Sequence, residues 1–97
     1  MSRRVIPLPF PEDPTVTSPA DFGAAVRAAR TTSGLTLEQA ALTIGVAKQT
    51  LQALELGTAS VGLALALRIA CELGVTVFVA RATERDEAAR LLRGLRD

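Results

Sequence analysis

The chain has 97 residues, of which 48% are hydrophobic and 3% aromatic, and its net charge at pH 7 is +1. This length allows one small domain with a single core, and a core made mostly of Ala, Leu and Val suits close-packed helices. Histidine is absent and Cys71 is the single cysteine, so we expect no disulfide within the chain, no Cys/His metal site and no cofactor. The apolar runs are short and interrupted by charges, and no signal peptide is apparent, which predicts a cytoplasmic protein with no membrane span.

Residues 1–18 are predicted to form an extended N-terminal arm. The segment contains the alternating prolines Pro7, Pro9, Pro11 and Pro14. Proline lacks a backbone donor and favours extended structure. Several apolar residues lie between the prolines, so we expect part of the arm to pack on the domain or on a partner.

Residues 19–74 are predicted to form a domain of four helices. The first begins with Ser18 as cap, Pro19 at its first position and Asp21 completing a capping box. The stretch Leu35–Gly57 then predicts two short helices joined by a turn at Gly45, and the first of these can be capped by Thr36. A fourth helix is expected over 63–73, with its inner side formed by Leu63, Leu67, Ala70 and Leu73.

Two short amphipathic helices around a glycine are typical of a helix-turn-helix, whose second helix lies in the major groove of DNA. The same pattern also occurs in proteins that bind nothing. Between residues 20 and 73 there are four cations and four anions: Arg27, Arg30, Lys48 and Arg68 against Asp21, Glu38, Glu55 and Glu72. Because phosphate neutralisation supplies most non-specific affinity, a neutral domain is expected to need a second copy, a basic partner or cations gathered on one face.

Residues 75–82 contain the β-branched and aromatic run VTVFVA, which predicts a strand. A lone strand leaves its backbone groups unsatisfied, so it must pair with the arm or with the same strand of a second copy. The second arrangement predicts a symmetric homodimer, with the strand residues Val75, Val77, Phe78 and Val79 in the interface. Residues 83–97 are predicted to form a short C-terminal helix that packs on the dimer or binds a partner, with its apolar side formed by Ala88, Leu91, Leu92 and Leu95.

Residues 22–80 resemble the Xre-type helix-turn-helix family and, within it, the HipB-like antitoxins. The matching residues are the Gly-Leu-Thr at 34–36, the Gly-Val turn at 45–46 and Glu55 before Gly57, followed by the helix-then-strand ending LALRIACELGVTVFV. The resemblance implies a mainly α, lambda-repressor-like domain of four to five short helices. It also implies a C-terminal β-strand that pairs across a homodimer.

The resemblance further implies roles for individual residues. Arg30 and Glu55 match an internal ion pair that fixes the recognition helix. The base-reading positions of the family match Ala47, Lys48, Gln49, Thr50 and Gln52, and among these Lys48 suits guanine edges and Gln49 adenine edges. We add Thr36, which begins a helix whose N–H groups can take a phosphate, and Arg27, which projects from the first helix, as DNA-binding residues.

The sequence departs from the family where phosphates are usually held. Polar positions of the family are occupied by Leu37 and Leu56, and the loop over residues 58–62 carries no charge. Some members of the family end in an aromatic tail that docks on their kinase partner, whereas this chain has no Trp or Tyr. We therefore expect few side-chain contacts to DNA phosphates.

The resemblance implies an antitoxin and transcriptional autorepressor that binds a palindromic double-stranded DNA operator as a dimer. It also implies a complex with a HipA-like Ser/Thr kinase toxin. The alternatives are a protein-interaction module on the same scaffold with weak or no DNA binding, and a stand-alone Xre-type repressor. An enzyme with a small-molecule substrate is not expected, because no nucleophile beside a base, phosphate-cradling glycine loop or converging carboxylates are visible.

Overall fold

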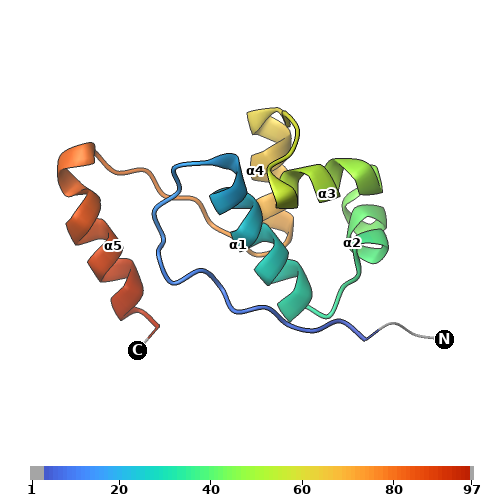
Figure 1. Ribbon diagram of the computed structural model, residues 1–97, viewed down its shortest axis with the longest axis horizontal. Helices are drawn as coiled ribbons and strands as arrows, with labels where there is room; N and C mark the ends of the chain where they lie inside the picture. Colours follow the sequence, from blue (N-terminus) through green and yellow to red (C-terminus); the bar gives the residue numbers. More distant parts are fainter. Residues whose placement is uncertain (1–3, 97) are drawn as a thin grey trace.

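The computed structural model describes residues 4–96, and this part of the chain folds as the mainly α protein that the sequence predicts. Its α-helices are α1 (Pro19–Thr32), α2 (Leu37–Ile44), α3 (Lys48–Leu56), α4 (Leu63–Glu72) and, after a 3-10 turn at Ala82–Glu84, α5 (Arg85–Gly94). Helices α1 to α4 form one group, and α5 lies apart from it on the far side of the N-terminal segment (Figure 1). The first three residues of the predicted arm and Asp97 lie outside the described residues.

No helix in the described part of the chain has both the length and the apolar character needed to cross a membrane.

Local hydrogen bonds set the start of α1. The Ser18 hydroxyl accepts the backbone N–H of Asp21 at 3.2 Å, as a helix cap should. The Asp21 carboxylate, however, accepts from the backbone N–H of Thr17 at 3.0 Å and from its hydroxyl at 3.1 Å. The predicted capping box is thus displaced by one residue. These bonds, above all the one from the Thr17 N–H, hold the pKa of Asp21 below its ordinary value.

The core lies between α1, α2, α3 and α4. Its largest fully buried side chains are Val26, Leu51 and Ile69, and around them are Ala40, Ala41, Ile44, Leu54, Ala66 and Ala70. Helix α1 crosses the end of α3 closely at Gly23, where a Cβ atom would lie 2.3 Å from the carbonyl oxygens of both Leu54 and Glu55. Glycine is therefore required in the middle of α1, in spite of its low helix propensity, because α3 needs that space.

Helix α4 faces the core with a side that matches the predicted one only in part: Ala70 is buried and Leu73 packs on the core as predicted. Its buried residues are Ala66, Ile69 and Ala70, whereas Leu63 is 73% exposed and Leu67 40% exposed. Apolar residues occur on every side of this helix, so the sequence pattern alone did not define its inner face. Tertiary packing decides it, because Ala66, Ile69 and Ala70 join one core cluster with the buried residues of α1, α2 and α3.

Residues 75–80 are extended but form no strand with any described residue. The Val75 N–H donates to the Ala70 carbonyl at 2.8 Å, and the Val75 side chain is half-buried against the core. No hydrogen bond within residues 4–96 involves the backbone of residues 76–80. The predicted strand is therefore absent from a single chain, since a strand exists only where its backbone pairs with another.

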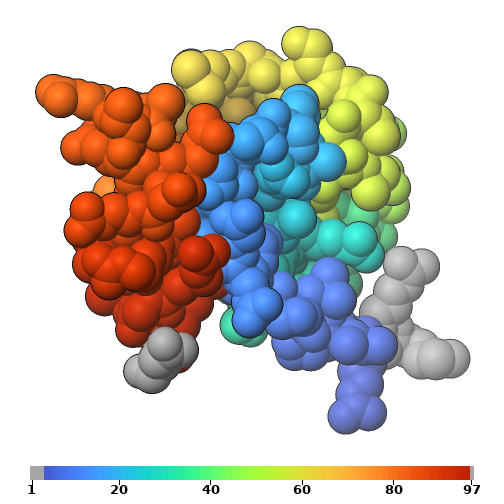
Figure 2. All heavy atoms as spheres, turned by 60° about the vertical axis from the view of Figure 1, so that its left-hand side comes forward, coloured from blue at the N-terminus to red at the C-terminus, as the bar shows by residue number. Residues whose placement is uncertain are grey.

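Helix α5 departs from the prediction in its inner face. Ala89 is buried and Ala88 and Leu92 are half-buried, but Leu91 and Leu95 are exposed. The chain just after α5 contacts the N-terminal segment, residues 4–18. The Arg96 guanidinium lies 5.0 Å from the centre of the Phe10 ring and donates to the Pro11 carbonyl. Figure 2 shows α5 in red and orange beside this blue segment.

The N-terminal segment runs without regular secondary structure along α1, where the Leu8 N–H donates to the Thr31 hydroxyl at 3.0 Å. It closes one side of a groove of about 710 Å³, whose other sides are α1, residues 75–82 and α5. The groove is lined mainly by apolar side chains, including Phe22, Val77 and Leu92.

Candidate nucleic-acid interface

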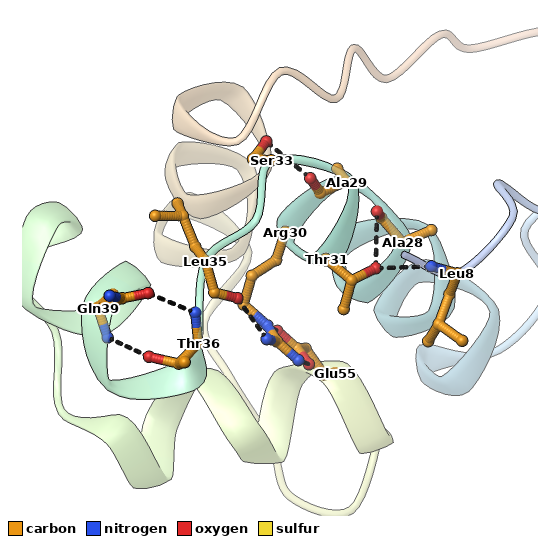
Figure 3. Close-up of polar contacts among 10 residues, drawn as sticks. All are labelled: Leu8, Ala28, Ala29, Arg30, Thr31, Ser33, Leu35, Thr36, Gln39 and Glu55. Carbon is orange, nitrogen blue, oxygen red and sulfur yellow. Dashed lines mark hydrogen bonds and ion pairs between the residues drawn. The ribbon is translucent and has the colours of Figure 1, made fainter. Parts of the chain in front are cut away.

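The α2–turn–α3 unit is built from short-range interactions. At the start of α2 the Thr36 hydroxyl accepts the Gln39 N–H at 3.1 Å, and the Gln39 side chain accepts the Thr36 N–H at 2.9 Å (Figure 3). Gly45 ends α2 at φ +85°, a conformation that other residues rarely adopt. Ala47 then begins α3 as its N-cap, without a side-chain hydrogen bond.

An ion pair between Arg30 of α1 and Glu55 of α3 holds this unit against the rest of the domain. The guanidinium donates through Nε to Oε2 at 2.6 Å and through Nη2 to Oε1 at 3.0 Å, the bidentate geometry that suits Arg and a carboxylate (Figure 3). Arg30 and Glu55 are only 7% and 6% exposed. The third nitrogen, Nη1, donates to the Leu35 carbonyl at 2.8 Å. One side chain thus fixes both the last turn of α3 and the entry to α2.

The side chains at the start of α3 are available to a ligand. Ala47, Lys48, Gln49 and Gln52 are exposed, and Thr50 is half-buried. An exposed ion pair joins Lys48 Nζ to Glu38 Oε2 at 3.6 Å across the turn. Exposed pairs of this kind contribute about 0–1 kcal/mol, so Glu38 does not prevent Lys48 from turning to another acceptor.

Two further predicted residues lie in different settings. Thr36 is half-buried and its backbone N–H is already bonded to Gln39, so this N–H is not available to a phosphate. Its hydroxyl keeps a proton to donate. Arg27 is exposed on α1 and has no ion pair with any residue in the described part of the chain. The first turn of α3 has no side-chain cap, so its N–H groups remain suited to an anion.

The predicted dimerisation residues divide into one inner and three outer positions. Val75 is half-buried, whereas Val77, Phe78 and Val79 are 47%, 72% and 95% exposed. Three consecutive large apolar side chains at the surface, on a backbone without partners among the described residues, are characteristic of a surface that another chain covers.

Sequence reasoning missed the close approach at Gly23, the Lys48–Glu38 ion pair and the hydrogen bond from Leu8 of the arm to Thr31. Only the first had a signal, because a glycine in the middle of a predicted helix indicates a close approach of another backbone. The other two contacts join residues whose distance depends on the angle between helices or on the path of the arm. Neither the angle nor the path can be predicted from a local sequence pattern.

Comparisons with known proteins agree with this geometry. A family model described as Helix-turn-helix matches residues 26–79, which is more than half of the chain. Among solved structures, a HipB variant in complex with a 20mer named O2 superposes with a TM-score of 0.61 at 22% identity, covering 70% of this chain and 94% of that chain. At this identity the likeness concerns the fold. No curated protein sequence matches the chain significantly.

The buried ion pair predicts a large loss of stability when one partner is removed. Glu55→Ala leaves the Arg30 guanidinium buried and unpaired, so it should lower the free energy of unfolding by about 3–5 kcal/mol in urea titrations followed by circular dichroism at one protein concentration. The exposed Glu87–Arg90 pair is the control, and Glu87→Ala should cost less than about 1 kcal/mol. The double variant Arg30→Met/Glu55→Leu should recover most of the loss. Equal effects of Glu55→Ala and Glu87→Ala would contradict the assignment.

Proposed function

This chain belongs to the Xre-type helix-turn-helix family of DNA-binding proteins, and from that premise we propose that it is a HipB-like antitoxin and transcriptional autorepressor. The observation that carries the DNA-binding part is the exposed start of α3, with Lys48, Gln49 and Gln52 at the surface of a helix whose other end is held by the Arg30–Glu55 pair. We propose a role in binding rather than catalysis, for a protein of the cytoplasm.

In the proposed complex α3 lies in the major groove. Lys48 donates to the O6 and N7 atoms of guanine, Gln49 bonds the N6 and N7 atoms of adenine, and the Ala47 methyl group contacts a thymine methyl group. Gln52 and Thr50 complete the reading surface. The Thr36 hydroxyl, the N–H groups at the start of α3 and the Arg27 guanidinium contact phosphates and set the register.

The small number of cations on the proposed surface indicates that a single copy of the chain binds DNA weakly. On the proposed surface the cations are Arg27 and Lys48, and Glu38 lies beside Lys48. Because few phosphates are neutralised, affinity has to come from base contacts made twice. A symmetric dimer would present two α3 helices about one DNA turn apart, roughly 34–36 Å, on a palindromic operator.

The dimer itself is proposed through residues 75–80. The exposed side chains of Val77, Phe78 and Val79, and the backbone of residues 76–80, which has no hydrogen bond within residues 4–96, support antiparallel pairing with the same segment of a second copy. The small core, in which four of nine buried residues are alanines, adds a stability argument, because little apolar surface is buried within one chain.

The kinase partner is proposed from the resemblance to HipB-like antitoxins. A HipA-like Ser/Thr kinase toxin bound to the dimer would add positive surface and raise the affinity for the operator. The second candidate function, an interaction module with weak or no DNA binding, is favoured by the exposed Leu56 and by the uncharged loop over residues 58–62. A stand-alone Xre-type repressor lies between the two.

DNA binding is tested by gel shift with the DNA upstream of the gene. The wild type should shift this DNA, and Lys48→Ala/Gln49→Ala should weaken binding by about 1–3 kcal/mol for each lost base contact. Arg90→Ala is the matched control, since it removes one positive charge from an exposed ion pair on α5. It should leave the shift nearly unchanged. No shift by the wild type, with or without a partner protein, would favour the interaction module.

The dimer is tested by sedimentation at micromolar concentration. Neighbouring N–H groups of a strand point to opposite edges, so one of Val77→Pro and Phe78→Pro should remove a pairing donor and convert the dimer to a monomer. The other should dissociate less. Unchanged helical circular dichroism would show that both variants are folded, and a wild type that sediments only as a monomer would contradict the proposal.

The kinase partner is tested by purifying the tagged protein from its native host and identifying bound proteins by mass spectrometry. A Ser/Thr kinase that co-purifies with the wild type in stoichiometric amount, and binds it again after separate purification, is the expected result. Recovery of the protein without any kinase would leave the stand-alone repressor as the better account.

A further inference from the structure

Arg68 of α4 reaches the turn between α2 and α3. Its Nη2 atom donates to the carbonyl of Ile44, the last residue of α2, and its Nε atom donates to Glu72 Oε2 at 3.1 Å. The same Nη2 atom lies 3.8 Å from the point where a Cβ atom of Gly45 would be. The guanidinium is therefore packed against the turn itself, although about half of the side chain is exposed.

The contact supplies a hydrogen-bond donor to a carbonyl group at the C-terminal end of α2. The last four carbonyl groups of a helix have no partner within the helix, and they carry its negative dipole end. The N–H groups of Gly45 and Val46 both donate to the Ala41 carbonyl, at 2.9 and 3.0 Å, which leaves the Ile44 carbonyl for another donor. Helix α2 has no basic residue in its own last turn. Arg68 supplies both the donor and the positive charge from a different helix.

The turn determines how α3 is presented. Only Gly45, Val46 and Ala47 separate α2 from α3, so a change in their conformation changes the angle between the helices. Lys48 and Gln49 follow at once, and a small rotation there moves their side chains away from a base edge. The Arg30–Glu55 pair holds the other end of α3 and does not reach the turn.

We propose that Arg68 is a positioning residue for DNA recognition: it fixes the turn at the Ile44 carbonyl and thereby orients Lys48 and Gln49 for base contacts. This inference rests on the proposed function. Arg68 acts through the turn rather than on DNA, so it governs the preference for the operator over other sequences more than it governs general affinity for DNA.

Two variants and one control test this role. Arg68→Met keeps most of the length of the side chain but removes its donors, and Arg68→Lys keeps the charge and a single donor nitrogen. Arg90→Met removes the same charge from an exposed pair that lies on α5. For each protein the affinity is measured for the upstream duplex and for an unrelated duplex of equal length, and amide hydrogen exchange is measured at Gly45, Val46 and the core residue Leu51.

Arg68→Met should lose about tenfold in affinity for the upstream duplex, the loss expected when a base contact is misplaced. Its affinity for the unrelated duplex should change no more than that of Arg90→Met. Exchange at Gly45 and Val46 should rise about tenfold relative to Leu51, as in local opening of a turn. Arg68→Lys should recover part of both effects.

The inference is overturned if Arg68→Met prefers the upstream duplex as strongly as Arg90→Met does, or if exchange at the turn is unchanged. It is also overturned if both duplexes lose affinity equally, because Arg68 would then act as a general charge. A wild type that does not discriminate between the duplexes refutes the proposed function instead, and hydrogen exchange then decides alone whether Arg68 holds the turn.

Discussion

The arrangement of this domain depends on the Arg30 guanidinium. Each of its three nitrogen atoms has an acceptor: two are carboxylate oxygens of Glu55 at the end of α3, and the third is the Leu35 carbonyl before α2. A buried charge is tolerated only when it is paired and hydrogen-bonded in this way. Once α1 holds both segments, the α2–turn–α3 unit has one orientation, and the polar start of α3 is directed away from the core.

Close packing reinforces this constraint. Gly23 lets α1 lie directly on the carbonyl groups at the end of α3, so the two helices that carry the ion pair cannot separate without losing their packing. Arg68 contacts the middle of the unit, where it donates to the Ile44 carbonyl at the turn. Arginine suits both places, because its planar group serves several acceptors and stays charged at every relevant pH. In the proposed arrangement, rigid presentation of α3 rests on Arg30, which is buried, and on Arg68, which is half-exposed beside the turn.

Two exposed surfaces bear on the proposed function: the start of α3, which is nearly neutral, and the apolar surface of residues 77–79, Leu91 and Leu95. The residues proposed to face DNA carry little net charge, so in the proposed complex specificity comes from side-chain geometry and from a second copy. Residues 77–79 and the outer residues of α5, Leu91 and Leu95, leave apolar area exposed beside the groove that the N-terminal segment closes. A domain with this distribution is suited to assembly with other chains, and in the proposed function DNA binding depends on that assembly.

The sequence by itself determined the boundaries of the recognition unit. The Thr36 cap, the glycines at positions 45 and 57 and the polar run after Ala47 act through neighbouring residues, and the family model confirms the Xre-type assignment made from them. The tertiary structure alone decided which side of α4 is buried, that Glu38 lies beside Lys48 and that Arg68 reaches Ile44. Hydrogen bonds within a turn and backbone angles are local properties, whereas these contacts depend on how whole helices pack. Residues 75–80 are the intermediate case: their composition favours a strand, but pairing is a property of two segments and cannot be read from one.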